Sequence, residues 1–283
     1  MDGEILNLYE STVVSTFVIS GGTGSLGSSL ARHLITNTDH KVRILDRSEA
    51  KIERMAAQFP PDARVTYIVG DIRDRERLTT AFHRADIIVH AAALKIVAMG
   101  EVHANEFFKT NIVGTFNCIE AAIANHATVK KFLFIGSDKG CDPVGGYGTS
   151  KRAGEWLTRA ANLHGHDVHF ASVRGGNVWM SRGSVIEKWL TANREIIVRN
   201  PDTTRFHLPM QYWLEFSLKA IESMHGGEVF IPKCDAWKLM DLAQAFQLVV
   251  KDKSVIVAPP NFGDKLNESL ISEEESRSSI DLG

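Results

Sequence analysis

Residues 13–27 read VVSTFVISGGTGSLG, an apolar, β-branched run that leads directly into a glycine-rich turn. An amphipathic helix pattern follows over residues 25–36. Glycines allow a tight turn and a close approach of the backbone to a pyrophosphate, and the start of the helix supplies N–H donors and a positive dipole end. The stretch therefore predicts a dinucleotide-binding strand, loop and helix. The expected cofactor contacts in the loop are Gly21, Thr23, Gly24, Ser25, Leu26 and Gly27.

Short apolar strands alternate with amphipathic helices through the first 174 residues. The expected strands are 13–20, 41–45, 65–69, 86–91, 131–137 and 168–173, and the expected helices are 25–36, 49–58, 76–84, 106–125 and 147–164. This alternation predicts an α/β fold with a doubly wound parallel sheet, the Rossmann arrangement. After residue 174 the pattern becomes mixed. We expect a Rossmann domain over residues 1–174 and a smaller, mixed substrate lobe over 175–283, partly interleaved with the sheet.

The bulk composition excludes several classes of partner. The net charge of −2 gives no electrostatic reason to expect nucleic acid or an anionic membrane. Three cysteines without a CxxC pair argue against a disulfide framework or a metal site and fit a reducing compartment, so we expect a cytoplasmic protein. Residues 1–10 do not resemble a signal peptide, and no apolar run reaches the ~20 residues of a membrane span. Residues 273–283, acidic and Ser-rich, are expected to form a frayed tail or the start of missing structure.

Further cofactor contacts are expected where the next strands end. Asp46 could bind the hydroxyls of an adenosine ribose, whereas Arg47 could neutralise a 2′-phosphate; because Asp46 would repel that phosphate, we favour NAD over NADP. Asp71, with Ile72 beside it, could accept a hydrogen bond from an adenine amino group or could simply cap a helix. Small side chains that let the backbone approach a cofactor occur at Ala91, Ala92 and Ala93.

A YxxxK pair, Tyr147 and Lys151, opens the expected helix over residues 147–164. A spacing of four places both side chains on one helix face. Lys151 can lower the pKa of the phenol and can hold a nicotinamide ribose, so both residues also count as cofactor contacts. The phenolate can then act as a general base on a substrate hydroxyl, and Ser137 at the end of a strand can hydrogen-bond the same oxygen.

Two ionisable residues, Asp138 and Lys139, follow Ser137 directly. The carboxyl ends of parallel strands are where α/β sheets bind ligands. The two residues could form a surface ion pair, or they could be an acid and a base for a second chemical step. Simple hydride transfer does not require such a pair.

Together these motifs resemble the extended short-chain dehydrogenases and, more narrowly, the inverting UDP-N-acetylglucosamine 4,6-dehydratases of the flagellin- and capsule-sugar type. The resemblance covers residues 14–275 and rests on segments 21–27, 91–95, 110–115, 137–151, 174–178, 181–185, 204–206, 226–233, 241–243 and 263–268. It departs from the family pattern at Asp46, Ile96, Ala98, Gly136, Ser137 and Gly145–Gly146. These departures concern the substrate, the stereochemistry and the cofactor phosphate more than the reaction class.

The resemblance implies a redox-neutral reaction with a tightly bound NAD(P). Tyr147 would take the proton of the sugar 4-hydroxyl as hydride leaves C4, after which Lys139 would remove H5 and Asp138 would protonate the departing 6-hydroxyl. A neutral Lys139 would need positive charge nearby, such as Lys151 and the oxidised nicotinamide. Hydride would return to C6, giving a UDP-4-keto-6-deoxy sugar, inverted at C5 if the proton returns to the other face. The resemblance adds Asn111 to the cofactor contacts and also implies a homo-oligomer.

A UDP-sugar would need cations for its diphosphate. Arg182 and Arg205 could clamp it through bidentate bonds, although each could equally be structural. Lys95, Asn177 and Lys233 are further expected substrate contacts. Two other functions remain open: a nucleotide-sugar epimerase, which does not need Asp138 and Lys139, and a non-enzymatic NAD(P)-sensing regulator, which would not need the YxxxK pair.

Overall fold

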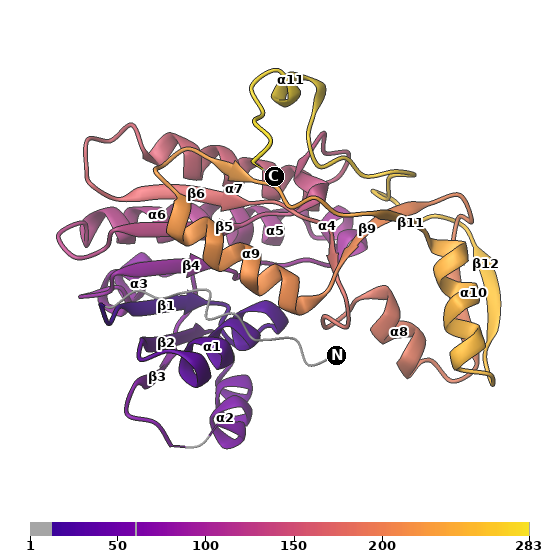
Figure 1. The fold of residues 1–283 in the computed structure, drawn as a ribbon, viewed down its shortest axis with the longest axis horizontal. Helices are drawn as coiled ribbons and strands as arrows, with labels where there is room; N and C mark the ends of the chain where they lie inside the picture. Colours follow the sequence, from indigo (N-terminus) through magenta and orange to yellow (C-terminus); the bar gives the residue numbers. More distant parts are fainter. Residues whose placement is uncertain (1–12, 60, 283) are drawn as a thin grey trace.

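The structure, a computed structural model, describes residues 13–59 and 61–282 of the chain. At its centre lies a seven-stranded sheet in the order β10-β6-β5-β4-β1-β2-β3, in which every neighbouring pair is parallel (Figure 1). The strands are β1 (Thr16–Ser20), β2 (Lys41–Asp46), β3 (Val65–Val69), β4 (Ile87–His90), β5 (Lys131–Ile135), β6 (His169–Val173) and β10 (Val229–Phe230). The strand order reverses beside β1, so the predicted doubly wound fold is confirmed.

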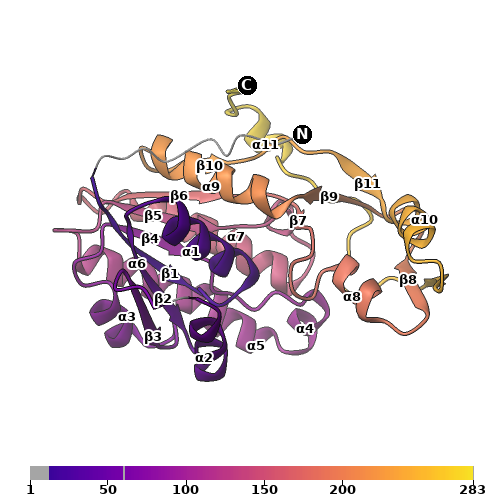
Figure 2. The same cartoon turned by 60° about the horizontal axis from the view of Figure 1, so that its bottom comes forward.

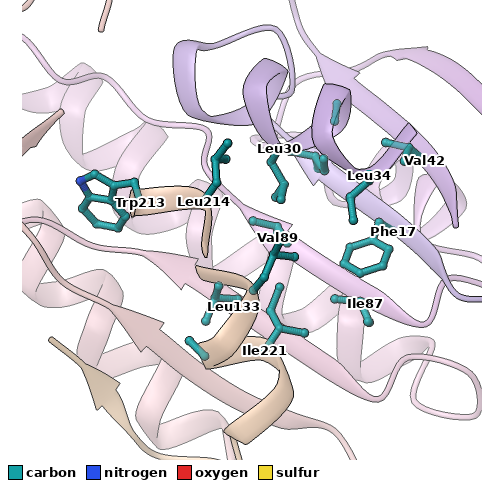
Figure 3. Packing of buried hydrophobic residues seen from close by; sticks show 14 of the residues in the cluster. Phe17, Leu30, Leu34, Val42, Ile87, Val89, Leu133, Trp213, Leu214 and Ile221 are labelled. Atoms are coloured by element: carbon teal, nitrogen blue, oxygen red, sulfur yellow. The ribbon is translucent and has the colours of Figure 1, made fainter. Parts of the chain in front are cut away.

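Helices cover both faces of this sheet (Figure 2). They are α1 (Ser25–Asn37), α2 (Glu49–Gln58), α3 (Arg75–Ala81), α6 (Gly114–Ala124), α7 (Gly146–Ala161) and α9 (Met210–Ser223), while the short α4 (Val97–Val102) packs against α7. The alternation of β1 explains the two cores, because Phe17 and Ile19 pack on one face and Val18 on the other. Figure 3 shows the first core, in which Leu30 of α1 and Ile221 of α9 lie over the strands.

Several expected elements differ from the observed ones, among them the helices expected over residues 76–84 and 147–164, which end at Ala81 and Ala161. The strand expected over residues 13–20 begins at Thr16, where pairing with Lys41 begins, and the side chains of Val13 and Val14 are exposed. The helix expected over residues 106–125 has an irregular middle. It consists of α5 (Ala104–Phe107), the π-helix η1 (Phe108–Val113) and α6.

The chain after residue 174 contributes to two parts of the molecule. α9 and β10 return to the central sheet, where β10 pairs with β6. The remainder forms two small sheets, β11-β9-β7 and β12-β8, with α8 and α10 beside them at one end of the molecule (Figures 1 and 2). Their bounds are β7 (Asn177–Val178), α8 (Val185–Thr191), β8 (Glu195–Arg199), β9 (Thr204–Leu208), β11 (Ala236–Lys238), α10 (Leu239–Val249) and β12 (Ser254–Ala258).

The expectation of a frayed tail over residues 273–283 is wrong at its start. There α11 (Glu273–Ser276) begins with a capping box between Ser272 and Glu275. Both carboxylate oxygens of Glu275 accept hydrogen bonds from Arg174, at 2.8 and 2.9 Å. Arg174 is fully buried and also donates to Glu155 at 3.0 and 2.7 Å. A buried guanidinium needs such partners, so the sequence after β12 is held against the core.

Replacing Glu275 by Gln should destabilise the folded chain by roughly 1.5–3 kcal/mol, the usual contribution of hydrogen bonds to a charged group. The Arg174 guanidinium holds the pKa of Glu275 well below its ordinary value of 4.5. A depressed folded-state pKa gives stability that is complete above the unfolded pKa and is lost as the pH falls below it. Urea unfolding should therefore show a difference between the two proteins at pH 7 that shrinks below pH 4.5. Glu273→Gln, on an exposed side chain of the same helix, is the control.

Candidate active site

A cleft of about 1070 Å³ runs along the carboxyl ends of the central strands and under the small sheets. Its walls include the glycine loop, the first residues after β2, β3, β4 and β5, the start of α7, and residues 175–178, 181–185 and 264–266. The cleft lies at the reversal of strand order, where open α/β sheets bind ligands. Its volume is at the upper end of the range for sites that hold small molecules.

The glycine loop needs its glycines. Gly21 has φ +69°, and a Cβ there would lie 2.7 Å from the backbone of Ala92; a Cβ on Gly27 would lie 2.5 Å from the carbonyl oxygen of Gly21. All the predicted contacts of the loop line the cleft except Thr23. The Thr23 hydroxyl instead donates to Asp46 at 2.5 Å and ties the loop to β2. The open N-terminus of α1 therefore faces a cleft wall that suits a pyrophosphate.

Asp46 and Arg47 both line the cleft. The second oxygen of Asp46 accepts from the backbone N–H of Ser48 at 3.0 Å, so the carboxylate is fixed in position. Asp71 and Ile72 also line the cleft.

The Asp71 carboxylate lies on Arg73, with Nη2 to Oδ2 at 2.9 Å. Although burial raises the pKa of Asp71, the hydrogen bonds from Arg73 outweigh it and the pKa is lowered. The alternative of Asp71 as a helix cap is wrong, because Asp74 caps α3.

Ala91, Ala92 and Ala93 line the cleft, whereas Asn111 is buried beneath it. The Asn111 amide accepts from the Leu94 N–H at 2.8 Å and donates to the Leu94 carbonyl and the Ser150 hydroxyl, both at 2.9 Å. Asn111 thus fixes the chain after β4 to the first turn of α7, and π-helical turns such as η1 are frequent at functional sites.

Tyr147 and Lys151 project from α7 into the cleft, which Ser137 and Lys139 also line. Lys151 Nζ donates to the Ile135 carbonyl at 2.6 Å, and burial lowers the pKa of Lys151 to about 8 although Glu155 raises it. Burial raises the pKa of Tyr147, while the charge of Lys139 and a hydrogen bond with Ser137 oppose this effect. The structure therefore brings four of the five predicted catalytic residues to one surface.

The fifth, Asp138, lies directly behind that surface with 1% of its area exposed. Its Oδ1 accepts from the Ser137 hydroxyl at 3.0 Å and from Lys139 Nζ at 3.1 Å. Lys139 Nζ is also 3.6 Å from Glu268 Oε1 and 3.5 Å from Asn177 Oδ1.

These neighbours decide the charge of Lys139. Burial lowers the pKa of Lys139, but Asp138 and Glu268 outweigh it and the pKa is raised. In the resting site the two carboxylates, and not positive neighbours, therefore dominate the charge around Lys139. The positive charge of Arg205 lowers the pKa of Lys139, but the two carboxylates outweigh this effect.

Two of the expected substrate cations lie in the cleft close enough for their charges to interact. Lys95 and Arg182 both line it, and burial followed by the charge of Arg182 lowers the pKa of Lys95. An anionic group between them would relieve this repulsion. The backbone N–H of Arg182 donates to the Ser25 hydroxyl at 2.9 Å, so this cation lies beside the glycine loop.

The other two expected cations have different partners. Arg205 lines the cleft, but its guanidinium donates to the carbonyls of Thr204, Lys265 and Leu266 at 2.7, 2.8 and 3.0 Å. The structure does not bring Lys233 to the cleft. Its side chain is exposed and pairs with Asp281 at 2.7 Å, because the chain after β10 runs along the surface beside the C-terminal segment.

Sequence reasoning gave no role to two buried residues near Lys139. Glu268 lies within the segment 263–268 that carries the resemblance, but nothing in the sequence paired it with Lys139. His207 of β9 has no hydrogen-bond partner at either ring nitrogen among the described residues. Burial lowers the pKa of His207 to about 4, with Lys139 and Arg205 adding to the effect and Asp138 opposing it.

Within residues 13–59 and 61–282, no group of three or more His, Cys, Asp or Glu side chains is arranged to hold a metal ion. In the same part of the chain, no helix has both the length and the apolar character needed to cross a membrane.

Comparison with known proteins identifies the family. A family profile described as polysaccharide biosynthesis protein matches residues 17–283. The UDP-N-acetylglucosamine 4,6-dehydratase (inverting) of Campylobacter jejuni is 38% identical over 92% of this chain and 78% of that protein, and the UDP-glucose 4-epimerase of Rickettsia massiliae is 35% identical over 95% and 81%. The X-ray structure of Pen from Bacillus thuringiensis superposes with a TM-score of 0.90 at 32% identity and covers 95% of this chain and 87% of that one.

A more distant structure shares the fold. It is the dTDP-glucose 4,6-dehydratase DesIV of Streptomyces venezuelae, solved with NAD and TYD bound, with a TM-score of 0.78 at 20% identity over 94% of this chain and 93% of that one. The resemblance stated from the motifs is therefore confirmed. Since the profile covers nearly the whole length, from Phe17 in β1 to the last residue, the chain belongs to the polysaccharide biosynthesis protein family.

Proposed function

We propose that this chain is an NAD(P)-dependent 4,6-dehydratase that converts UDP-N-acetylglucosamine to a UDP-4-keto-6-deoxy sugar with inversion at C5. The observation that carries the proposal is the Asp138–Lys139 ion pair directly behind Ser137, in the same cleft as Tyr147 and Lys151. Oxidation at C4 needs only Ser137, Tyr147 and Lys151, so the buried pair is available for loss of water. The Campylobacter jejuni relative, 38% identical, carries the name of this activity.

The first step uses the residues that line the cleft. The Ser137 hydroxyl and the Tyr147 phenol hold the 4-hydroxyl, and the phenolate takes its proton. Lys151, with a pKa near 8, lies within the same wall, and its charged form would favour the phenolate. The bound dinucleotide supplies the acceptor, and later the donor, of one hydride. The glycine loop and the open end of α1 fit its pyrophosphate.

Water loss requires an amine and an acid at the same time. Transfer of one proton from the Lys139 ammonium to Asp138, across the 3.1 Å contact, produces both. The amine then takes H5 as the C5–H bond breaks, and the electron pair moves toward C5–C6 as the C6–O bond breaks. Ser137 lines the cleft and donates to Asp138 at 3.0 Å, so its hydroxyl connects the acid to the departing oxygen. Asp138 and Lys139 end the step with their resting charges.

The nucleotide end of the substrate fits the other side of the cleft. Lys95 and Arg182 both line it and their charges interact, so a diphosphate bound between them would form charge-assisted bonds to both. Asn177 lies next to Lys139 and is placed for a sugar hydroxyl. Arg205 is engaged with backbone carbonyls and is assigned to holding the chain around residues 265–266.

Incubation with UDP-N-acetylglucosamine in deuterium oxide tests the proposal. A dehydratase should release water and place one solvent deuterium at C5, which NMR and mass spectrometry would both detect. A product that keeps all its oxygens and is inverted at C4 would instead identify an epimerase, the activity named for the Rickettsia massiliae relative at 35% identity. Asp138→Asn separates the two further, because it should leave an epimerase active and inactivate a dehydratase.

The purified protein should carry a tightly held dinucleotide, and we propose NAD. A redox-neutral cycle never needs to release it, and the fixed Asp46 carboxylate at the cleft wall would repel a 2′-phosphate. Chromatography of the supernatant after denaturation gives the answer. Arg47→Ala should still carry NAD, whereas recovery of NADP alone from the wild-type protein would show that Arg47 outweighs Asp46.

We also propose a cytoplasmic homo-oligomer. The cysteines of the described part of the chain are free, which suits a reducing compartment. Phe108 and Val113 of η1, Phe116 of α6 and Trp156 of α7 are partly exposed apolar side chains on neighbouring helices, and a second copy could cover them. Light scattering of the purified protein measures the solution mass.

A further inference from the structure

Lys139 lies between two buried carboxylates that come from distant parts of the chain. Its Nζ is 3.1 Å from Asp138 Oδ1 and 3.6 Å from Glu268 Oε1. The Glu268 side chain is 3% exposed and the Asp138 side chain 1%. Of the three, only Lys139 lines the cleft. Glu268 therefore does not touch a substrate itself and acts through its neighbours at the cleft, of which Lys139 is the nearest.

The position of Glu268 is built into the fold. Arg205 donates to the carbonyls of Lys265 and Leu266, and the Thr204 hydroxyl donates to Asn267 Oδ1 at 2.7 Å. Lys265 Nζ in turn donates to the Cys141 carbonyl at 2.7 Å, directly after the 3-10 turn η2 (Asp138–Gly140) that carries Lys139. The segment around Glu268 is thus attached both to β9 and to the turn of the ion pair.

The charges around Lys139 come from four elements. Asp138 lies on its own turn, Glu268 and Lys265 on the C-terminal segment, and Tyr147 on α7. Arg205 and His207 face it from β9. Glu268 Oε2 has no hydrogen-bond partner among the described residues, and its nearest cation is Lys265 at 3.8 Å. Since a buried carboxylate needs a countercharge, Glu268 depends on Lys139 and Lys265 for its stabilisation.

We propose that Glu268 is a positioning residue that holds Lys139 in its ammonium form and so determines the pH at which Lys139 can act as a base. This role rests on the proposed dehydratase reaction, in which Lys139 must lose a proton before it takes H5. Removing the Glu268 charge leaves Asp138 as the single carboxylate in contact with the ammonium. Neutral Lys139 then forms at lower pH.

Competitive labelling of the purified protein with acetic anhydride tests this, because only a neutral amine reacts. Peptide mass spectrometry would follow the acetylation of Lys139 as a function of pH. In Glu268→Gln the midpoint of Lys139 acetylation should move to lower pH. At any pH below both midpoints, a shift of one pH unit means about tenfold more neutral amine than in the wild-type protein. Glu268→Asp keeps the charge and should stay near the wild-type midpoint. Asn267→Ala loosens the same segment while keeping the charge and should also stay there.

A second variant, for which the midpoint should shift in the opposite direction, keeps the test valid if Glu268→Gln does not fold. Lys265→Gln removes the other cation beside Glu268, so the Glu268 charge acts on Lys139 alone and the midpoint should move to higher pH. Midpoints that do not move in either variant would overturn the inference, even if the wild-type protein is an active dehydratase. Midpoints that move in a protein without dehydratase activity would reject the proposed function and leave the control of Lys139 intact.

The pH profile of catalysis gives an independent readout. In Glu268→Gln, formation of 6-deoxy product should begin at lower pH than in the wild-type enzyme. A purely structural role would lower the rate at every pH and leave the shape of the profile unchanged, which would contradict the inference. Because Tyr147 also senses Glu268, formation of reduced nicotinamide is followed in the same samples to separate the two steps.

Discussion

Tyr147→Phe should lower turnover by ~10²–10⁴-fold, the usual loss when a general base is removed. The change deletes only the phenol oxygen that takes the proton of the 4-hydroxyl. The ring itself packs edge-on against Phe107, with centroids 6.3 Å apart, and phenylalanine keeps that contact. The affinity for the UDP-sugar should therefore change little, because the diphosphate contacts proposed for Lys95 and Arg182 are not altered. Steady-state rates and calorimetric titration with UDP-sugar measure the two quantities separately.

Tyr212→Phe is the matched control. Tyr212 lies on α9, partly exposed, and its hydroxyl makes only a 3.5 Å contact with the Lys233 carbonyl. Its loss should alter neither turnover nor binding. Full activity of Tyr147→Phe would remove the basis for the proposed oxidation step, and loss of binding together with turnover would instead show that the phenol serves mainly to hold substrate.

The central sheet was predictable because its signals are local. The apolar run before Gly21 and the periodicity of the following segments specify strands and helices that pack on both faces of a parallel sheet. The π-helical turn η1 was not predictable, because the periodicity of residues 106–125 predicts a regular helix. The ordered start of the C-terminal segment was missed for a similar reason. Its acidic residues predict a solvated tail. In the structure one of them, Glu275, is a partner of Arg174, which is buried and distant in sequence.

The active-site residues also include some that the sequence predicts and some that it does not. Ser137, Lys139, Tyr147 and Lys151 meet in one cleft because a strand end and the next helix carry them, and short motifs report that arrangement. Short motifs did not predict the roles of residues that are positioned by contacts with distant parts of the chain.

Arg205 fits the expected diphosphate clamp by residue type, yet its guanidinium is engaged by the backbone around Lys265. Glu268 contacts Lys139 through the tertiary arrangement of a segment that lies far from it in the sequence. No sequence spacing connects Glu268 with Lys139, so the charge of Lys139 could not be predicted from the sequence.

Lys139→Ala should separate oxidation from elimination. Oxidation uses Tyr147 and Lys151, so reduced nicotinamide should still form when UDP-N-acetylglucosamine is added. Removal of H5 needs the amine, so 6-deoxy product should form ~10²–10⁴-fold more slowly. Absorbance of the reduced cofactor and the mass of the sugar product follow the two steps in one reaction. The variant also brings together Asp138 and Glu268 without a cation between them, and two such carboxylates favour the uptake of a proton.

Lys139→Arg controls for that change in charge. A guanidinium keeps a cation between the two carboxylates, but it does not lose its proton in a protein and cannot act as the base. The arginine variant should therefore stall at the same step as the alanine variant while keeping the ion pairs of the resting site. If both variants accumulate reduced cofactor without product, the missing function is proton removal and not charge balance. If only the alanine variant stalls, Lys139 acts through its charge and another group takes H5. If neither variant forms reduced cofactor, Lys139 is needed before the elimination, either to hold the substrate or to lower the pKa of Tyr147, on which its charge acts directly.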